Sequence, residues 1–420
     1  MANPNCRILL LLAGCILLFC QPTVVAQSEF TGTTMGPIAY RVVVYEVDDE
    51  VKLKQGIQSE LDRVNDLMST YVSDSDVSRV NAADAEKWTE VNPLTLKVIE
   101  KAIEISKLTS GAFDITVGPA VRRWKFGPDA EQIEYPSDAE VADMLSYVGF
   151  GKLNLQADPP SIQKSDSRTQ IDLSAIAKGF AVDQVAMLLK SEGYENFMVE
   201  VGGEVYASGR KPDAKWRIGI EKPKFEGCTL AVSGAIEISD VAVATSGDYR
   251  NTRIYNGQRI SHTINPATCR PVLDSPASCS VIAADCMTAD AIATAIMVMG
   301  AKRGMELCLG NDFDANIANR MGNDSSNFKS VTSDNFPQIQ PIQTKANSAT
   351  QPQSIWPAFA GALIIFSLAI LGMAVGAIFN EKPISGSCGG IAAKTGEDGD
   401  TSCSLCHKPV AECPEEQEVT

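Results

Sequence analysis

The sequence is poor in histidine and lacks both common glycine-rich phosphate-binding loops. Only His262 and His407 occur in 420 residues. No G-x-x-x-x-G-K-[ST] or G-x-G-x-x-G pattern is present, which excludes the standard loop cradles for nucleotides. A phosphate ligand would therefore have to be held by a cation, a lysine and main-chain amides.

Positive charge is also scarce. There are 36 Lys and Arg residues against 52 Asp and Glu, so the net charge is -16, and no basic stripe is present. This balance argues against a nucleic-acid partner. With 45% hydrophobic residues the chain can bury a large core, and its length favours more than one unit.

Two apolar runs predict export and a membrane anchor. Residues 1–27 combine a single charge, an apolar run and a small-residue cleavage pattern, as in a signal peptide; Leu12-Ala-Gly-Cys15 also resembles a lipoprotein signal, so cleavage, lipidation at Cys15 and an uncleaved anchor stay open. Residues 355–379 contain no charge and exceed the roughly 20 residues that span a bilayer. We expect a bacterial inner-membrane protein with its body in the periplasm and its tail in the cytoplasm.

Residues 28–329 predict an α+β domain, with mixed sheets and flanking helices, because strands and helices alternate without a regular βαβ rhythm. Asn92-Pro93 and the pair Ser137 and Glu140 are helix N-terminal signals. Asn256-Gly257 predicts a hairpin. Residues 330–354, rich in Gln, Ser, Pro, Thr and Asn, predict a linker, and residues 380–420 form a cysteine-rich tail.

A buried helix over residues 286–300 carries the first candidate site. Apolar residues at helical spacing cover most of its circumference, Asp290 is its only charge, and Thr294 lies one turn later on the same face. A buried carboxylate needs a partner, and this pair of oxygen ligands suits Mg²⁺ better than zinc or copper. The alternative is that Asp290 only favours the helix N-terminus from its first turn.

Other side chains have two interpretations each. Lys178, early in a helix that we expect to begin near Ser174, reaches a phosphate or is a solvated lysine. Asp172 binds a ligand hydroxyl or caps that helix. His262, on the far arm of the hairpin, takes a proton from an attacking hydroxyl or is a hydrogen-bonded sheet residue. Three residues enclose a flat ring or belong to the core: Met35, Tyr71 and Phe113.

The tail carries a candidate metal site. Cys403 and Cys406 form a close thiolate pair, with Cys388, Cys413 and His407 as further soft ligands, which suits zinc, iron or an iron–sulfur cluster. Cytoplasmic thiols stay reduced and free to bind metal. The alternatives are a disulfide or a disordered tail. Body disulfides are also possible in an oxidising compartment, although no pairing follows from the sequence.

Eight motifs together resemble the ApbE family of FAD:protein FMN transferases over about residues 31–320. In family order they are TTMG at 33–36, MSTYVSDSDVSRVN at 68–81, GAFDITVGP at 111–119, IDLSAIAKGFAVD at 171–183, VEVGGE at 199–204, ATSGDYRN at 244–251, SHTINP at 261–266 and CMTADAIATA at 286–295.

The resemblance implies an exported, Mg²⁺-dependent enzyme. Such an enzyme splits FAD, attaches FMN through a phosphoester to a Thr or Ser hydroxyl of a target protein, and releases AMP. By matching motif, His262 would be the base that activates the acceptor hydroxyl. Asp290, Thr294 and the main-chain oxygen of Ala175 would hold the metal. The residues implied to contact FAD are Met35, Tyr71, Ala112, Phe113, Asp114, Asp172, Lys178 and Ile264.

Three positions depart from the family's usual pattern. Asn265 stands where the family has Asp, Cys269 where it has Gly, and Pro37 where Thr is usual. The missing carboxylate at Asn265 predicts weaker orientation of His262 or of the cofactor. Because the metal pair and the histidine are present, we still expect an active enzyme.

From about residue 355 to 415 the chain resembles a second family, the NqrM-type maturation factor of the sodium-translocating NADH:quinone reductase. The single span, the segment IFNEKPISGSCGG at 378–390 and the later cysteines carry the likeness. It implies iron delivery or metal-centre assembly in that complex. Since that complex carries FMN linked to threonine, its subunits are the expected flavin acceptors. The rival functions are a Mg²⁺-dependent FAD pyrophosphatase and a non-enzymatic flavin-binding lipoprotein.

Overall fold

The computed structural model forms two units, Met1–Ile342 and Gln343–Thr420. In the described ranges, no helix is both long enough and apolar enough to cross a membrane. The predicted span at 355–379 and the tail cysteines lie outside these ranges, as does nearly all of the predicted signal at 1–27. The structure describes residues 26–124, 135–223, 232–248, 252–255, 258–273, 276–321, 324–341, 394–395 and 401–402.

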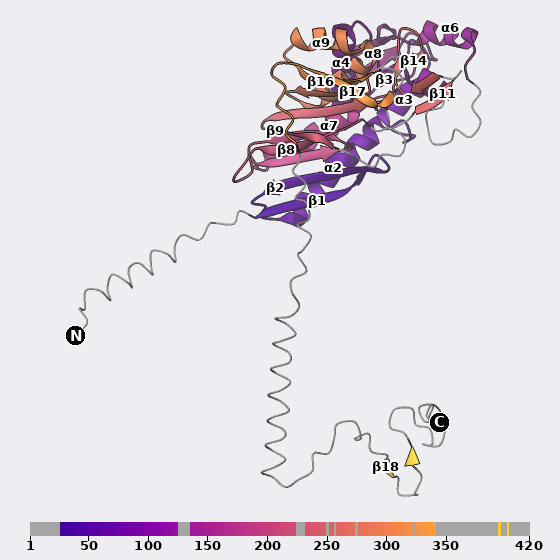
Figure 1. Ribbon diagram of the computed structural model, residues 1–420. Coiled ribbons are helices and arrows are strands. Elements are labelled where there is room, and N and C mark those ends of the chain that lie inside the picture. Colours follow the sequence, from indigo (N-terminus) through magenta and orange to yellow (C-terminus); the bar gives the residue numbers. More distant parts are fainter. Residues whose placement is uncertain are drawn as a thin grey trace, which may run out of the picture. The chain divides into compact units, whose positions relative to one another are not determined.

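The first unit is built on an eight-stranded sheet (Figure 1). Every neighbouring pair in it is antiparallel, so the expectation of mixed sheets is wrong for this sheet, while the α+β organisation is confirmed. The one parallel pairing in the described chain is the isolated bridge between Val117 and Gln170. In spatial order the strands are β1 (Gln27–Thr34), β2 (Ile38–Tyr45), β6 (Phe197–Val201), β7 (Glu204–Ser208), β10 (Val241–Gly247), β15 (Ser278–Ala283), β16 (Asp314–Met321) and β17 (Asp324–Thr332).

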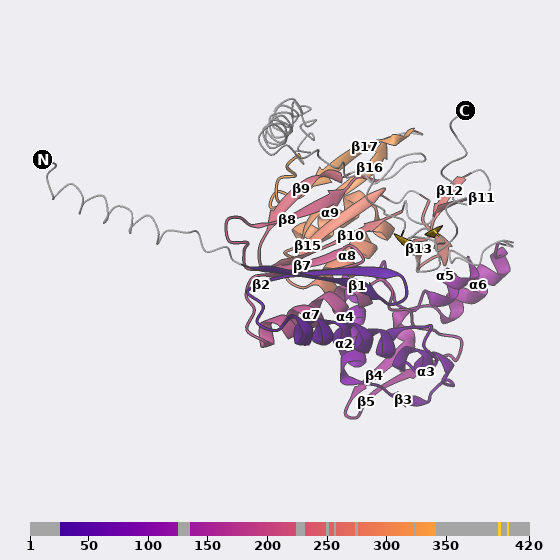
Figure 2. The same ribbon diagram turned by 90° about the horizontal axis from the view of Figure 1, so that it is seen from below.

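The two faces of this sheet are covered differently. Side chains alternate along a strand. Val42 and Val44 therefore enter one hydrophobic core, called the first core, while Val43 enters another, called the second core. Helices cover the first face, and Figure 2 shows α2, α4 and α7 on that side. The hairpin of β8 (Trp216–Glu221) and β9 (Val232–Ile238) covers the second face, with Trp216 and Ile236 buried in the second core.

The helices begin at the sequence signals where such signals exist. Asn92 caps α4 by accepting from the amide of Leu94, and Ser137 with Glu140 forms the predicted capping box of α6. The first unit contains α2 (Glu50–Met68), α3 (Asp76–Ala82), α4 (Pro93–Leu108), α5 (Gly118–Arg123), α6 (Asp138–Tyr147), the short 3₁₀ helix η1 (Phe150–Lys152), α7 (Ala177–Ser191), α8 (Cys286–Met299) and α9 (Ala301–Leu309).

Smaller sheets complete the described structure. The predicted hairpin is confirmed, because Tyr255 pairs with Gln258 across a two-residue loop. Residues 169–172 form no strand beyond the isolated bridge of Gln170 to Val117. The small sheets contain β3 (Trp88–Glu90), β4 (Leu153–Ala157) and β5 (Pro160–Lys164); β11 (Thr252–Tyr255) and β12 (Gln258–Ser261); β13 (Ile264–Asn265) and β14 (Arg270–Pro271); and, in the second unit, β18 (Lys394–Thr395) and β19 (Thr401–Ser402).

The folded body extends beyond the start of the predicted linker at residue 330. Strand β17 continues to Thr332, Phe336 is buried in the second core, and Gln340 bridges to Ala235 of β9. The polar composition of this segment therefore did not reveal the end of β17 or the buried aromatic side chain. The folded body reaches at least Pro341.

Candidate active site

A cavity of about 320 Å³ lies where helices α7 and α8 meet the ends of strands β7 and β10. Helix α8 packs against α7, β10 and β15, and its residues Asp290 and Thr294 line the cavity. The cavity is lined by His262, by the three expected metal ligands Ala175, Asp290 and Thr294, and by six of the expected FAD contacts, namely Ala112, Phe113, Asp114, Asp172, Lys178 and Ile264.

Two expected FAD contacts do not line this cavity. Met35 has a φ of +48° in the turn between β1 and β2, and it packs against the first core. Tyr71 is 95% exposed in the turn that follows α2. The structure thus gathers most of the predicted site but leaves these two side chains outside it.

Helix α7 approaches α8 very closely, and glycine makes this possible. A Cβ built at Gly179 would lie 2.3 Å from the carbonyl oxygen of Cys286. The amide of Gly179 donates to Asp290 Oδ2 at 3.1 Å, while Asp183, one turn further along α7, accepts from the amides of Cys286 and Met287 at 2.8 and 2.9 Å. These contacts hold the start of α8, and hence Asp290, against α7.

The Gly179 contact predicts a large effect of one methyl group. In Gly179→Ala, backbone must move because a carbonyl oxygen, not a flexible side chain, occupies the space. We expect a loss of about 3 kcal/mol in the free energy of unfolding, measured by urea denaturation. Gly151→Ala is the control, since a Cβ there meets nothing within 4 Å. Equal stability of the two variants would contradict the close approach.

The Asp183 carboxylate predicts a pH-dependent stability. Burial raises its pKa to about 7, against the lowering effect of the two amide donors. Since the unfolded side chain ionises near its ordinary pKa, the folded state binds the extra proton between about pH 4 and pH 7, and stability falls as pH rises through that window. The Asp183→Asn variant cannot bind this proton, so its stability lacks this dependence on pH. The stability of wild type relative to the variant should therefore be lower at about pH 8 than at about pH 5 in urea denaturation; an unchanged difference would refute it.

Lys178 lies between two buried carboxylates. Its ammonium is 3.2 Å from Asp290 Oδ2 and 3.2 Å from Glu204 Oε1, and Asp290 and Glu204 are only 2% and 3% exposed. Burial alone would lower the pKa of Lys178, but the two carboxylates raise it above its ordinary value. Lys178 is therefore a charged group in an ion pair, and the interpretation as a solvated lysine is wrong.

Asp290 does not serve the N-terminus of its own helix. Helix α8 begins at Cys286, Asp285 caps it by accepting from the amide of Thr288, and no acidic residue lies in its first turn. Asp290 instead faces α7 and the cavity. This removes the alternative interpretation of Asp290 as a residue that only favours the helix start.

The residues fit a hard divalent cation. Asp290 and Thr294 lie on successive turns of α8, and the Thr294 hydroxyl is 3.3 Å from the hydroxyl of Ser246 on β10; Ala175 lines the same cavity. In the described part of the chain, no group of three or more His, Cys, Asp or Glu side chains could hold a metal. One carboxylate with neutral oxygens is the donor set of a Mg²⁺ ion that is completed by substrate phosphates.

The segment before α5 is fixed by Asp114. This buried carboxylate accepts from the amide and hydroxyl of Thr116 at 2.8 and 2.6 Å and from the amide of Phe150 at 2.7 Å. Burial raises its pKa although these hydrogen bonds lower it. Through these buried hydrogen bonds, Asp114 stabilises the wall of the cavity that carries Ala112 and Phe113.

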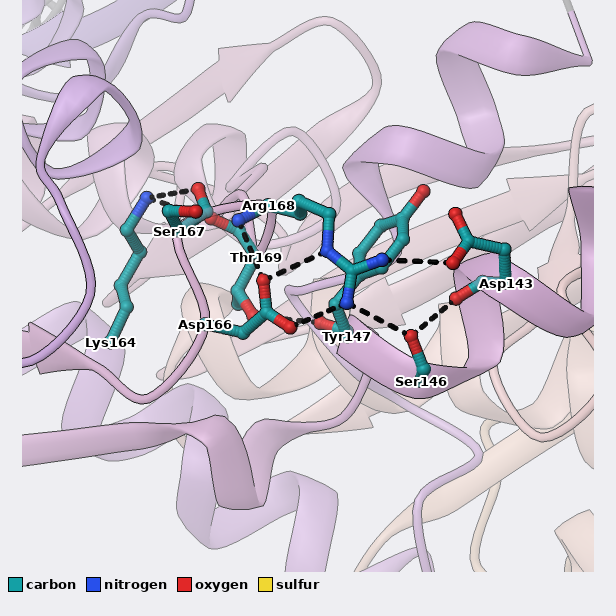
Figure 3. A network of polar contacts seen from close by, with 8 residues as sticks. All are labelled: Asp143, Ser146, Tyr147, Lys164, Asp166, Ser167, Arg168 and Thr169. Carbon is teal, nitrogen blue, oxygen red and sulfur yellow. Dashed lines mark hydrogen bonds and ion pairs between the residues drawn. The ribbon is translucent and has the colours of Figure 1, made fainter.

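Asp172 lies beside this segment, because its amide donates to the carbonyl of Ile115 at 2.8 Å, and it follows a firmly anchored loop (Figure 3). The buried ammonium of Lys164 donates to the carbonyls of Asn81, Ser167 and Thr169 at 2.9–3.0 Å. Arg168 pairs with Asp166 and Asp143, donates to Ser146 and lies over the ring of Tyr147.

Beyond the loop, the Asp172 carboxylate accepts from the amide of Ser174. Asp172 therefore forms a local turn and does not cap α7, which begins at Ala177.

His262 follows β12 and lines the cavity beside Thr263 and Ile264. Asn265 uses its side-chain oxygen to accept from the amide of Ala267 at 2.9 Å, so this position shapes the turn between β13 and β14. Cys269 closes the same turn with a φ of +49°, a region that favours glycine. That conformation explains why glycine is the usual residue at this position of the family pattern.

Sequence reasoning missed several polar residues of the site. Glu204, Thr245 and Ser246 line the cavity, and Thr245 bonds Ser280 at 2.8 Å. Glu204 follows the Gly202-Gly203 turn, and a charged residue between such a turn and an apolar strand was the available signal. Four body cysteines, Cys269, Cys279, Cys286 and Cys308, are buried free thiols, so the described residues contain no disulfide among them.

Both parts of the chain match known protein families. Residues 35–317 match the profile of the ApbE family, and residues 377–419 match that of (Na+)-NQR maturation NqrM. The FAD:protein FMN transferase of Vibrio cholerae serotype O1 is 41% identical, over 72% of this chain and 89% of its own length; that of Haemophilus influenzae is 36% identical, over 72% and 91%. The solved structure of flavin transferase ApbE from Vibrio cholerae superposes with a TM-score of 0.66 at 38% identity, over 74% of this chain and 98% of that one.

Proposed function

The chain belongs to the ApbE family and is a transferase, and on that premise we propose that it moves FMN from FAD to a Thr or Ser hydroxyl of a target protein, with Mg²⁺ as cofactor and AMP as the second product. One observation carries the proposal. A single cavity brings together a histidine, a lysine and the Asp290–Thr294 pair from segments that are far apart in the sequence.

Each group has a task in this reaction. Lys178 neutralises charge on the diphosphate of FAD, and the Phe113 segment borders the flavin side of the cavity. The oxygen of the target Thr or Ser hydroxyl bonds to the FMN phosphorus, and His262 takes the proton of that hydroxyl. The bond from that phosphorus to the bridging oxygen breaks, and AMP leaves with the electron pair. Mg²⁺, held by Asp290, Thr294 and the Ala175 carbonyl, supplies further charge neutralisation when bound.

The test is transfer to a protein. The full chain in detergent is incubated with FAD, Mg²⁺ and a candidate acceptor, and the acceptor is analysed by mass measurement and by flavin fluorescence after denaturing electrophoresis. We expect a covalent flavin on the acceptor, with AMP released in equal amount. AMP release without labelling would favour a FAD pyrophosphatase, and intact FAD would favour a flavin-binding protein.

We further propose that residues 355–420 anchor the chain in the inner membrane and assist metal-centre assembly in the sodium-translocating NADH:quinone reductase. The match of residues 377–419 to the NqrM profile supports this. Cys388, Cys403, Cys406 and Cys413 are the proposed ligands for iron or an iron–sulfur cluster. Subunits of the same complex are the proposed flavin acceptors, with the transferase body in the periplasm.

The tail proposal has its own test. Replacing Cys403 and Cys406 together by Ser should lower iron bound by the purified full chain, measured by elemental analysis, while FMN transfer by the body is unchanged. Iron content equal to wild type would contradict the assignment of these thiols.

A further inference from the structure

Glu204 is a buried carboxylate that the reaction described above does not use. It begins β7, directly after the turn at Gly202 and Gly203, and lines the cavity. Its Oε1 pairs with Lys178 at 3.2 Å. Among the described residues its second oxygen, Oε2, has no hydrogen-bond partner although it is buried. A buried carboxylate with a free oxygen has capacity for a further contact.

Gly202 allows Lys178 and Glu204 to lie close to the turn that precedes β7. Gly202 has a φ of +64°, and a Cβ at this position would lie 3.3 Å from Lys178 Cδ and 3.4 Å from Glu204 Oε2. A glycine here therefore leaves the side-chain stem of Lys178 unobstructed on the side of Glu204. On its other side, Lys178 contacts both oxygens of Asp290 at 3.3 and 3.2 Å.

A cation at Asp290 and the ammonium of Lys178 compete for the same carboxylate. A divalent ion bound by Asp290 would repel an ammonium that stays on both of its oxygens. Lys178 has a side chain that is 22% exposed, and it needs a second anionic partner before it can leave, because an unpaired ammonium that is mostly removed from water is disfavoured. Glu204 is already in contact with it and has an oxygen to spare.

We propose that Glu204 is a positioning residue that takes over Lys178 when the metal occupies Asp290. The inference rests on the proposed function, in which Asp290 holds the metal. Lys178 then remains charged and able to contact the diphosphate of FAD. Glu204 affects metal binding only through Lys178.

The test is a double-mutant cycle on Mn²⁺ binding, with Mn²⁺ as an EPR-visible substitute for Mg²⁺, in the full-length protein without FAD. In the wild-type background, Glu204→Gln should weaken Mn²⁺ binding by about tenfold, because Lys178 loses its second partner. In the Lys178→Met background, the same change should weaken binding less than about twofold. Glu200→Gln is the control, since Glu200 lies on the neighbouring strand β6 and does not line the cavity.

The outcomes separate this inference from the proposed function. Equal losses in both backgrounds would mean that Glu204 acts directly on the metal and would overturn the inference alone. No loss in either background would overturn it as well. A wild-type protein that binds no Mn²⁺ would overturn both the inference and the proposed metal site. Glu204→Asp keeps the negative charge and should therefore bind Mn²⁺ more tightly than Glu204→Gln. If the loss in Glu204→Gln were a purely structural defect, Glu204→Asp would bind Mn²⁺ no more tightly. Thermal unfolding confirms that each variant is folded.

Discussion

Asp290→Ala should abolish FMN transfer. The carboxylate is 2% exposed, lies in the cavity, and joins α8 to Lys178 and to the amide of Gly179. Removing it takes away the only charged oxygen in the proposed metal site and leaves Lys178 with Glu204 alone. We expect the rate to fall by at least about 10³-fold, equivalent to about 4 kcal/mol of transition-state stabilisation. The initial rate of acceptor labelling by flavin fluorescence measures it.

Asp290→Asn separates charge from packing. The amide oxygen of Asn can still accept from Gly179, so this variant should fold like wild type yet transfer FMN at a rate close to that of Asp290→Ala. Glu200→Gln removes a charge on the same sheet outside the cavity and should keep its activity. Transfer by Asp290→Ala within tenfold of wild type would remove the metal from the mechanism.

His262→Gly should slow FMN transfer by roughly 10²–10⁴-fold, the usual contribution of a general base. His262 lines the same cavity as Asp290 and is the only histidine in the described residues. The loss should appear in kcat, with the KM for FAD nearly unchanged, because an imidazole that takes a proton adds little to ground-state binding.

Chemical rescue distinguishes proton transfer from positioning. The His262→Gly variant leaves space for free imidazole, which should restore part of the rate, and the restored rate should rise with pH as more imidazole is neutral. A loss confined to the KM for FAD, with no rescue, would show that His262 binds the cofactor and that another group is the base.

Much of the fold could be read from local patterns. The helix over Cys286–Met299, the capping box at Ser137 and the hairpin at Asn256-Gly257 depend on spacing and turn chemistry within a few residues. The linker boundary failed because burial of Phe336 depends on a distant hairpin. The expected start of α7 near Ser174 failed because Asp172 forms a turn with Ser174 before the helix begins.

The sequence by itself determined the residue types of the site, the family pattern and the apolar helix that carries Asp290. Only the tertiary structure decided what each charge contacts: that Lys178 pairs with two carboxylates, that Glu204 is one of them, and that Tyr71 lies outside the cavity. The reason is physical. Helical and strand periods act over a few residues, whereas an ion pair between residues 178 and 290 exists only after the close packing of α7 on α8 at Gly179 brings their backbones together.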